Sequence, residues 1–211
     1  MFCTNKAAIF LVLIFSSSFL GSCIFTKHDD MPIKENGSYL NNKKHGYWVG
    51  YFPDNKKTYE GFYKLGLKDS TWNFYYESGI LLKNEFYKND KKNGSSIIFN
   101  ENGTIYSRVT YLDGQFHGEF IHYYGNGQKN FIKHYYQGKE YGSFNLYYET
   151  GKLKQKGQKR NNRNIGEWFF YNDNGVLVEK TIYSDLNDTI LTLNFDINGD
   201  TIGLKRSLSS K

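Results

Sequence analysis

The chain is poor in cysteine, which cross-links small proteins, and in proline, which kinks the backbone: its 211 residues include two of each, and only two methionines. Cys3 lies in a segment that we expect to be removed, which leaves one cysteine and excludes an internal disulfide. Long hydrophobic runs are also missing. Residues 7–20 are mostly apolar, but they are fewer than the roughly 20 residues that a membrane-spanning helix needs.

Patterns that carry catalysis, metal binding or nucleotide binding are missing as well. No Gly-x-Ser-x-Gly element occurs, and residues 125–127 (Gly-Asn-Gly) lack the helix that a dinucleotide fingerprint requires. Residues 196–200 resemble a calcium loop, but the glycine is misplaced and no glutamate follows at the twelfth position. We therefore expect no enzyme, no metal site and no cofactor. The histidines lack the spacing of zinc ligands and are interpreted as polar surface residues: His28, His45, His117, His122 and His134.

The chain is rich in aromatic residues, and they recur with a period. Tyr and Phe occur 19 and 17 times, and a short motif returns every 24 residues. A fixed period of this size is typical of repeat proteins, in which each unit buries its apolar surface against its neighbours. Six full units begin at residues that we call openers: Gly46, Ser70, Gly94, Gly118, Gly142 and Gly166.

Each unit is predicted to be a β-hairpin. In the second unit, residues 71–76 and 80–87 are two β-prone runs that flank a turn ending in Gly79. Later units have Asn-Gly at this turn, a strong hairpin signal because both residues tolerate left-handed backbone. Helical spacing of apolar residues is missing. The sequence therefore predicts an all-β fold, an elongated single-layer antiparallel meander or solenoid of stacked 24-residue β-hairpin repeats over residues 39–204, with partial repeats capping both ends.

Two positions of the unit carry rings in nearly every copy. Two residues after the opener the third unit has Ser96 instead of a ring, which predicts a weaker or bent stretch there. The rings five residues after each opener form our candidate site. The favoured role is that these rings stack on one another as a spine, at roughly 0.5–1.5 kcal/mol per ring pair, and a groove for a peptide, sugar or cation is the alternative. The six candidate rings are Tyr51, Tyr75, Phe99, Tyr123, Tyr147 and Tyr171.

Residues 1–22 are predicted to be a lipoprotein signal peptide. Lys6 precedes the apolar run, and Leu20-Gly21-Ser22-Cys23 follows it and resembles the lipobox of bacterial lipoproteins. The resemblance implies that Cys23 becomes the acylated N-terminus and anchors the protein to a membrane; an ordinary secretory signal is the alternative. Residues 23–38 lack the period and are predicted to be a flexible tether, and residues 205–211 a polar tail.

The charge balance is basic. The net charge of +6 becomes 6 − 1 = +5 when Lys6 is removed with residues 1–22. Nucleic acid is not an expected partner of an exported protein, so anionic lipid, surface polysaccharide or an acidic protein fits better, and solvation of a sheet face is the simplest interpretation. Residues 27–30 (Lys-His-Asp-Asp) resemble a surface-display signal of Gram-negative lipoproteins. We therefore expect the cell envelope, at the outer membrane, with surface exposure left open.

The unit Gly-x-Trp-x-x-Tyr-Tyr-x-x-x-Gly resembles the MORN-repeat variant of bacteria, and residues 118–127 and 166–175 are good copies. Proteins of that family are often labelled antitoxin components of toxin–antitoxin pairs, and related eukaryotic repeats are associated with membrane junctions and scaffolding. The leading hypothesis is a non-enzymatic, membrane-anchored lipoprotein whose repeat surface binds or scaffolds a protein partner. Two alternatives remain: an antitoxin or immunity protein that neutralises a toxin, and a cell-wall or glycan-binding module.

Overall fold

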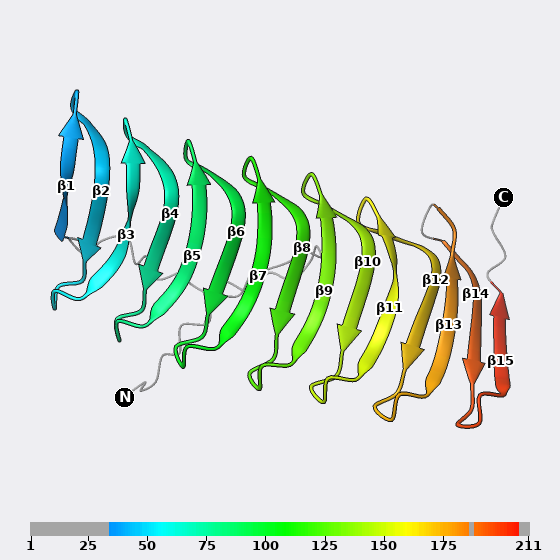
Figure 1. The fold of residues 1–211 in the computed structure, drawn as a ribbon. Coiled ribbons are helices and arrows are strands. Elements are labelled where there is room, and N and C mark those ends of the chain that lie inside the picture. Colours follow the sequence, from blue (N-terminus) through cyan, green and yellow to red (C-terminus); the bar gives the residue numbers. More distant parts are fainter. Residues whose placement is uncertain (1–33, 186–187, 207–211) are drawn as a thin grey trace, which may run out of the picture. The chain divides into compact units, whose positions relative to one another are not determined.

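The computed structural model describes residues 34–185 and 188–206, and these form one antiparallel sheet (Figure 1). Fifteen strands lie side by side in chain order, and this part of the chain contains no helix. The predicted class of a single all-β layer of consecutive hairpins is confirmed. The strands are β1 (Lys34–Leu40), β2 (Lys43–Tyr51), β3 (Lys57–Lys64), β4 (Leu67–Tyr75), β5 (Leu81–Lys88), β6 (Lys91–Phe99), β7 (Ile105–Leu112), β8 (Gln115–Tyr123), β9 (Lys129–Tyr136), β10 (Lys139–Tyr147), β11 (Leu153–Arg160), β12 (Arg163–Tyr171), β13 (Leu177–Tyr183), β14 (Thr189–Phe195) and β15 (Thr201–Arg206).

The sheet begins and ends beyond the predicted boundaries. Strand β1 begins at Lys34, so residues 34–38 belong to the sheet and not to the tether. Gly37 pairs with Trp48 and lies 24 residues before Gly61, so the period did mark this strand. Strand β15 ends at Arg206, two residues beyond the predicted end of the repeats at 204. The predicted signal peptide, the lipid attachment site Cys23 and the tether up to residue 33 lie outside the described residues.

Two kinds of turn alternate along the chain. Turns between units have two residues at positive φ, such as Asn89 (50°) and Asp90 (64°), as in tight two-residue hairpins. Turns within a unit end in a glycine at positive φ, such as Gly79 (87°), whose N–H donates to the carbonyl of Tyr76. Both kinds keep successive strands antiparallel and adjacent, which is why the strand order equals the chain order.

The Asn-Gly turns work differently from the prediction. At Asn102-Gly103 only the glycine has positive φ (83°). The Asn102 side chain instead accepts a hydrogen bond from the N–H of Thr104 at 3.0 Å, and Asn126 accepts one from Gln128 at 2.9 Å. Asparagine therefore fixes these turns through its side-chain oxygen and not through left-handed backbone.

Each opener is a bulge in the first strand of its unit. Gly94 has φ of 102° and Ser70 has φ of 62°, and the pairing with the preceding strand shifts around both residues. Bulges bend a strand and increase its twist, and the strands are visibly bowed (Figure 1). Glycine adopts positive φ without a steric cost, which explains its recurrence at this position.

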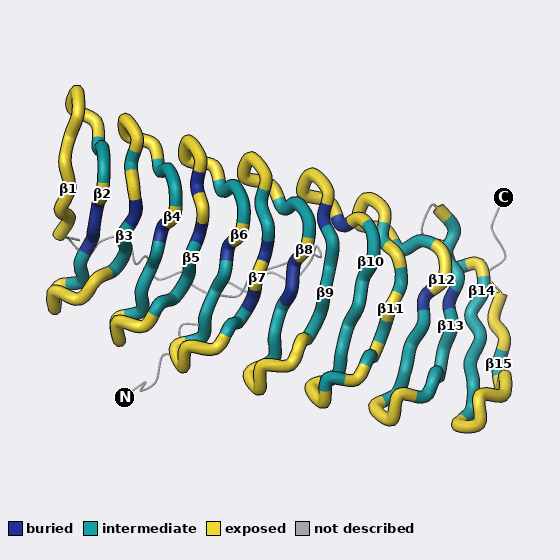
Figure 2. The backbone as a smooth tube through the Cα atoms, viewed as in Figure 1, coloured by how far each residue is buried: buried dark blue, intermediate teal, exposed yellow. Residues whose placement is uncertain are grey.

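The two faces of the sheet are buried to different degrees. Alternate side chains point to opposite faces, which places Trp48, Trp72 and Trp168 on one face, here called the Trp face. The six candidate rings lie on the other, called the open face. The three tryptophans are 2%, 1% and 1% exposed, and the buried residues lie within the strands, with exposed turns on either side (Figure 2).

Tryptophan and glycine are paired on the Trp face. Trp72 lies over Gly61 of the neighbouring strand, where an added Cβ would lie 2.3 Å from the indole ring. The same contact joins Trp48 to Gly37 and Trp168 to Gly157. Where a unit lacks this tryptophan the facing residue is larger: Glu85 faces Ser96, Val109 faces Phe120, and Lys133 faces Phe144. The facing residue is thus glycine where the unit has tryptophan, and larger where the unit has a smaller residue, as close packing requires.

Candidate binding surface

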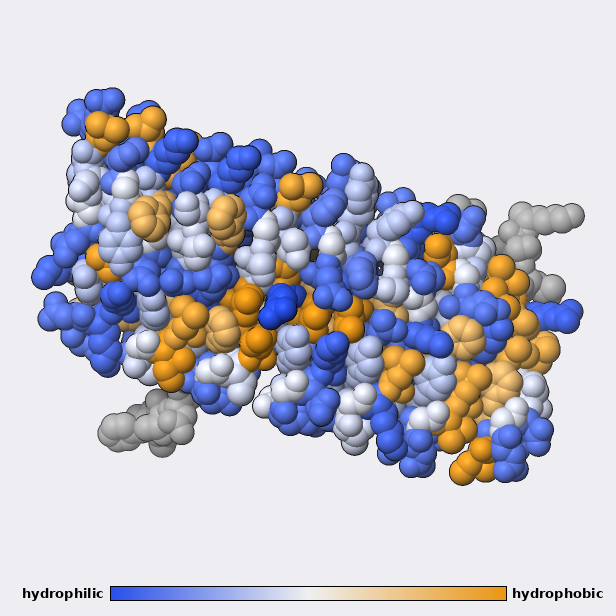
Figure 3. Space-filling view, in the orientation of Figure 1, coloured by the Kyte–Doolittle hydropathy of each residue, from blue (hydrophilic) through white to orange (hydrophobic). Residues whose placement is uncertain are grey.

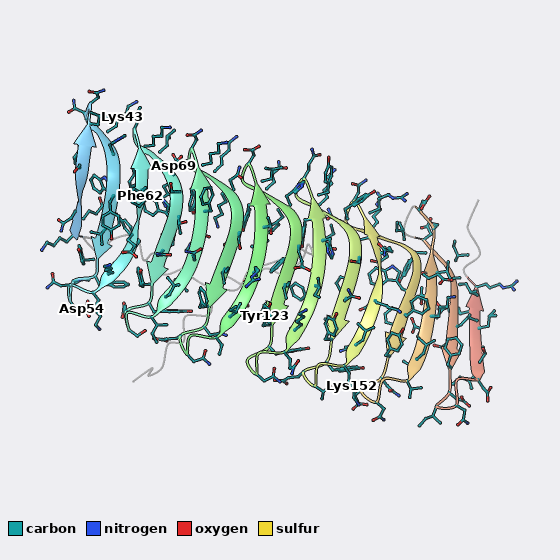
Figure 4. The ribbon with its side chains drawn as sticks, viewed as in Figure 1. Lys43, Asp54, Phe62, Asp69, Tyr123 and Lys152 are labelled. Carbon is teal, nitrogen blue, oxygen red and sulfur yellow. The ribbon has the colours of Figure 1, made fainter. Side chains whose placement is uncertain are left out.

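The six candidate rings do not stack on one another. None of the ring contacts found in residues 34–185 and 188–206 involves any of them. Equivalent residues of successive units lie two strands apart, about 9.6 Å, whereas rings in contact have centroids about 4.5–7 Å apart. The favoured spine role of this set is therefore wrong. All six are half-buried on the open face, where Tyr123 ends β8 (Figure 4), and their role in binding stays a prediction.

A series of ring contacts runs along the Trp face instead, between adjacent strands. Centroids are 5.9 Å apart for Trp48 and Tyr63, 4.8 Å for Tyr63 and Trp72, and 6.4 Å for Trp72 and Tyr87. The Nζ of Lys68 lies 4.5 Å from the centroid of Trp72, so a cation covers the rings. The spine therefore uses rings two and seventeen residues after the opener, except at Ser96 and Lys159, where these positions hold no ring.

A buried carboxylate interrupts this spine beside Ser96. Glu85 is 1% exposed, and its Oε atoms accept hydrogen bonds from Lys92 at 2.5 Å and from the Tyr87 hydroxyl at 2.7 Å. Burial alone would raise the pKa of Glu85, but the bond from Lys92, the charge of Lys83 and the Tyr87 hydroxyl outweigh it and hold the pKa below its usual range. An ion cluster thus fills the place where the sequence lacks a ring.

A second ion pair uses the same two repeat positions with the charges exchanged. Positions 85 and 92 recur at 85 + 48 = 133 and 92 + 48 = 140, which hold Lys133 and Glu140. Their side chains lie 2.6 Å apart, and Lys159 lies 3.0 Å from the same carboxylate. The Tyr135 hydroxyl donates to Glu140 at 3.3 Å, as Tyr87 does to Glu85. The packing therefore accepts either sign at each position when the pair is complete.

On the open face, the carboxylate of Glu60 in β3 has a full set of hydrogen-bond donors. Glu60 accepts hydrogen bonds from the hydroxyls of Tyr47 at 2.7 Å and Tyr75 at 2.5 Å, from Lys57 at 2.7 Å and from Asn73 at 3.2 Å. Burial would raise the pKa of Glu60, but these bonds outweigh it and lower the pKa to about 2. Burial and the bond to Glu60 raise the pKa of Tyr75, one of the candidate rings, to about 12.

One line of directly paired residues, here called the central line, crosses the open face. Its members from β3 to β13 are Glu60, Asn73, Asn84, Ile97, Arg108, Ile121, Ile132, Asn145, Lys156, Phe169 and Lys180. Over these strands the line is acidic first, then mostly aliphatic, and finally cationic and aromatic. It continues beyond them through Val49 to Asn36 and through Leu193 to Leu204. Hydrophobic residues also gather over the middle strands in the space-filling view (Figure 3).

At the far end of the central line, lysines lie over rings. The Nζ of Lys156 is 5.0 Å from the centroid of Phe169 and 6.0 Å from that of the candidate ring Tyr171. Lys180 lies 5.4 Å from Phe169 and 2.6 Å from a carboxylate oxygen of Glu167. The open face therefore has a neutralised carboxylate on β3 and, on β11 and β13, lysines of which Lys180 is paired with Glu167 and Lys156 is not paired with a carboxylate among the described residues.

The sequence interpretation gave no role to the tyrosines that directly follow three of the candidate rings. The hydroxyls of Tyr76, Tyr124 and Tyr148 donate to backbone carbonyls of the next unit, each at 2.8 Å. The acceptors are Phe99, Tyr147 and Tyr171, all members of the candidate set. The recurring Tyr-Tyr pair in the sequence could have indicated this role. The hydroxyl of its second tyrosine links each unit to the next.

Residues 34–185 and 188–206 contain no group of three or more His, Cys, Asp or Glu side chains that could hold a metal ion. No helix long and apolar enough to cross a membrane occurs in the same residues.

His122 is half-buried and stacks on Phe131 with centroids 5.2 Å apart, so its interpretation as a surface residue was wrong. Burial lowers the pKa of His122.

A sequence model of the family described as MORN repeat variant matches residues 68–89, 92–113, 140–158 and 165–185. Each match begins one or two residues before an opener. No curated protein matches the chain. One similar solved structure, titled "Crystal structure of GtfA/B complex bound to UDP and GlcNAc", is 14% identical with a TM-score of 0.24, and the match covers 64% of this chain and 26% of that one. The chain thus spans about a quarter of that structure's chain, and so weak a likeness supports no statement about function.

Proposed function

Because this chain belongs to the MORN-repeat family, in its variant form, we propose that it is a lipid-anchored, non-enzymatic protein whose open face binds a protein partner. MORN repeats are binding modules and are not typical enzymes. The observation that carries the proposal is the difference between the faces. The Trp face is occupied by contacts between units, whereas the opposite face of this single layer presents rings and charges.

The side chains of the open face suit a protein surface. Tyr47 and Phe62 are 45% and 48% exposed and contact each other there, and aromatic residues are enriched in protein interfaces. Aliphatic residues such as Ile97 and Ile132 lie in the middle of the central line. This mixture of aliphatic, aromatic and charged groups favours a protein over a glycan.

Photo-crosslinking in intact cells tests the proposal. A photoreactive phenylalanine analogue replaces Tyr123 or Tyr147 on the open face, and Tyr183 on the Trp face provides a tyrosine-for-tyrosine control. We expect one protein to crosslink from both open-face positions and not from Tyr183. Equal crosslinking from both faces, or none to any protein, would refute a partner site on the open face.

The identity of the crosslinked molecule separates the two alternatives. A toxin that kills the cell when this chain is deleted would make the binding role that of an antitoxin or immunity protein. Wall polysaccharide captured through Tyr123 in place of a protein would make the chain a glycan-binding module.

The lipid anchor at Cys23 is the second part of the proposal, supported by the Leu20-Gly21-Ser22-Cys23 pattern. The proposed location is the cell envelope, at the outer membrane, because residue 24 after the cysteine is Ile and not Asp. Cys23→Ala should abolish labelling by a palmitate analogue and move the protein out of the membrane fraction. Unchanged labelling and fractionation would refute the anchor and leave the open-face proposal standing.

A further inference from the structure

Strand β11 has a strict alternation found in no other described strand. Its residues alternate between half-buried and exposed along the whole strand, and its sequence is Leu-Lys-Gln-Lys-Gly-Gln-Lys-Arg. The exposed positions are Lys154, Lys156, Gln158 and Arg160. The pairing of Lys156 with Phe169 places this set on the open face. Three cations therefore lie in a row along one strand.

The two lysines of this row have no acidic partner. Among the described residues no carboxylate lies within ion-pair distance of Lys154 or Lys156. They lie over rings instead, with the Nζ of Lys154 5.1 Å from the centroid of Tyr148. Lys159, which points to the Trp face, is by contrast held by Glu140 at 3.0 Å. The strand thus neutralises its inner charge at Lys159. Of its outer cations, Arg160 is paired with Asp185 at 3.5 Å, and only Lys154 and Lys156 have no carboxylate beside them among the described residues.

The neighbouring strands do not neutralise Lys156 either, because Glu167, on the same face of β12, is bound to Lys180 at 2.6 Å. The residues paired with Lys156 are Asn145 on β10 and Phe169 on β12, neither of which is charged. The repeat position of Lys156 holds Glu60 in the first unit, where four hydrogen-bond donors surround the carboxylate. The same position holds Lys180 in β13, where Glu167 pairs it at 2.6 Å, so Glu60 and Lys180 are both neutralised whereas Lys156 is not.

The geometry points to an acidic, extended peptide segment of the partner protein as the occupant of this row. The inference rests on the proposed binding function of the open face. Alternate residues of an extended strand lie about 6.6–6.8 Å apart, so carboxylates on alternate residues of an extended peptide match the spacing of Lys154 and Lys156. Phe169 and Tyr171 lie beside the row and provide an apolar flank, a common arrangement at protein interfaces.

A flat anionic membrane matches this surface less well than a peptide does. Lys154 and Lys156 lie along β11, whereas the line across the sheet from Lys156 leads through Asn145 to Ile132 and Ile121 on one side. On the other side it leads through Phe169 to Lys180, which Glu167 already pairs. Glu119 is exposed on the same face and would oppose an anionic lipid surface. An extended peptide lying along β11 meets the cations without meeting this carboxylate.

Fluorescence anisotropy with the full chain tests the inference. The probe is a labelled nine-residue peptide with aspartate and threonine alternating, and its control has the same composition with the aspartates in one block. We expect the alternating peptide to bind more tightly, with an affinity that falls as salt rises. Lys154→Gln with Lys156→Gln should weaken binding about tenfold. Lys154→Arg with Lys156→Arg should keep it.

The matched control removes the same charge elsewhere. Lys88 and Lys91 are exposed and face each other across the β5–β6 turn, and Lys88→Gln with Lys91→Gln should leave binding unchanged. Circular dichroism of each variant checks that the sheet is intact.

Three outcomes would overturn the inference: equal weakening by both lysine pairs, equal binding of the two peptides, or vesicles of anionic lipid bound through Lys154 and Lys156 in place of peptide. Crosslinking from Tyr123 and Tyr147 that survives Lys154→Gln with Lys156→Gln would refute the peptide row alone. If the chain with Lys154 and Lys156 unchanged gives no crosslink to any protein from Tyr123 or Tyr147, the proposed function itself is refuted.

Discussion

The two faces of the sheet come from the same hairpins, yet they keep the 24-residue period to different degrees. On the Trp face the position two residues after the opener holds a large ring in five of the six units, with Ser96 the exception. On the open face the six candidate rings recur in every unit, but the position of Glu60 becomes asparagine, arginine, isoleucine and then lysine in later units. Packing between units requires the same kind of residue in every copy or a matched change on the facing strand, whereas a surface that binds one partner requires differences between copies.

Loss of a tryptophan should have the largest effect. Trp72→Ala is expected to lower the free energy of unfolding by about 3–5 kcal/mol, because it removes the contacts with Tyr63 and Tyr87 and uncovers Gly61. Tyr123→Ala on the open face removes a half-buried ring outside the spine and should cost about 1–2 kcal/mol. Denaturant unfolding followed by circular dichroism measures both. An equal or larger loss for Tyr123→Ala would remove the distinction between the faces.

Reversing one charge of a buried pair should come next. Glu85→Lys is expected to destabilise by about 3–5 kcal/mol, because it leaves Lys83 and Lys92 beside a new buried cation. Adding Lys92→Glu should recover at least about half of this loss, since it recreates the arrangement of Lys133 and Glu140. The same denaturant unfolding reports the coupling. A double variant no more stable than Glu85→Lys would show that the exchanged pairs are not equivalent.

The tryptophan–glycine pairs should show compensation of a smaller size. Gly61→Val is expected to cost about 1–3 kcal/mol, because its Cβ would lie 2.3 Å from the Trp72 ring. Trp72→Phe in the same chain should relieve the clash and reproduce the pair of Val109 and Phe120. Thermal unfolding of the single and double variants measures the relief. Strict additivity would mean that the two positions do not contact as described.

Acid should weaken both faces. Glu60, Glu85 and Glu140 all have a pKa below the ordinary 4.5. A lowered pKa in the folded state stabilises the protein fully above the unfolded value and less as the pH falls. For Glu60 the loss should occur between about pH 4.5 and about pH 2. The urea midpoint of unfolding should fall as the pH is lowered across this range. Glu60→Gln should remove the part of this pH dependence that comes from Glu60. Stability that rises on acidification would contradict these assignments.

The smallest effect is expected from a single hydroxyl. Tyr76→Phe removes the hydrogen bond to the carbonyl of Phe99 and should cost about 0.5–1.5 kcal/mol. Tyr136→Phe is the control, since Tyr136 is 55% exposed and its variant should unfold like the unmodified chain. Urea unfolding resolves the difference. Identical stability of both variants would mean that the tyrosine link between units contributes nothing.

The repeat period, the hairpins and the all-β class could be predicted because glycine turns and a fixed period are local signals in the sequence. The spine could not, because rings 24 residues apart lie two strands apart, which only the strand order reveals. Tyr51 and its equivalents looked like a stack for this reason. The contacts between Trp48, Tyr63 and Trp72 depend on adjacent strands and on the bulges that set their pairing.

The candidate site shows the same limit. The alternating lysines of residues 154–156 are visible in the sequence, but their meaning depends on which face is packed. The partnership of Glu85 with Lys92 depends on a pairing shift around Gly94 that no local pattern indicates. The repeat period and the turn residues thus predicted the repeat units, and the pairing of strands decided which side chains remain available.

Amine labelling of the folded full chain, followed by mass spectrometry, tests most directly whether the faces differ. Lys133 on the Trp face is 14% exposed at its side chain and bound to Glu140 at 2.6 Å, whereas Lys156 on the open face is exposed and has no acidic partner among the described residues. Acetylation should therefore modify Lys156 well before Lys133. Equal rates at the two lysines, or faster reaction at Lys133, would contradict a closed Trp face and an open opposite face.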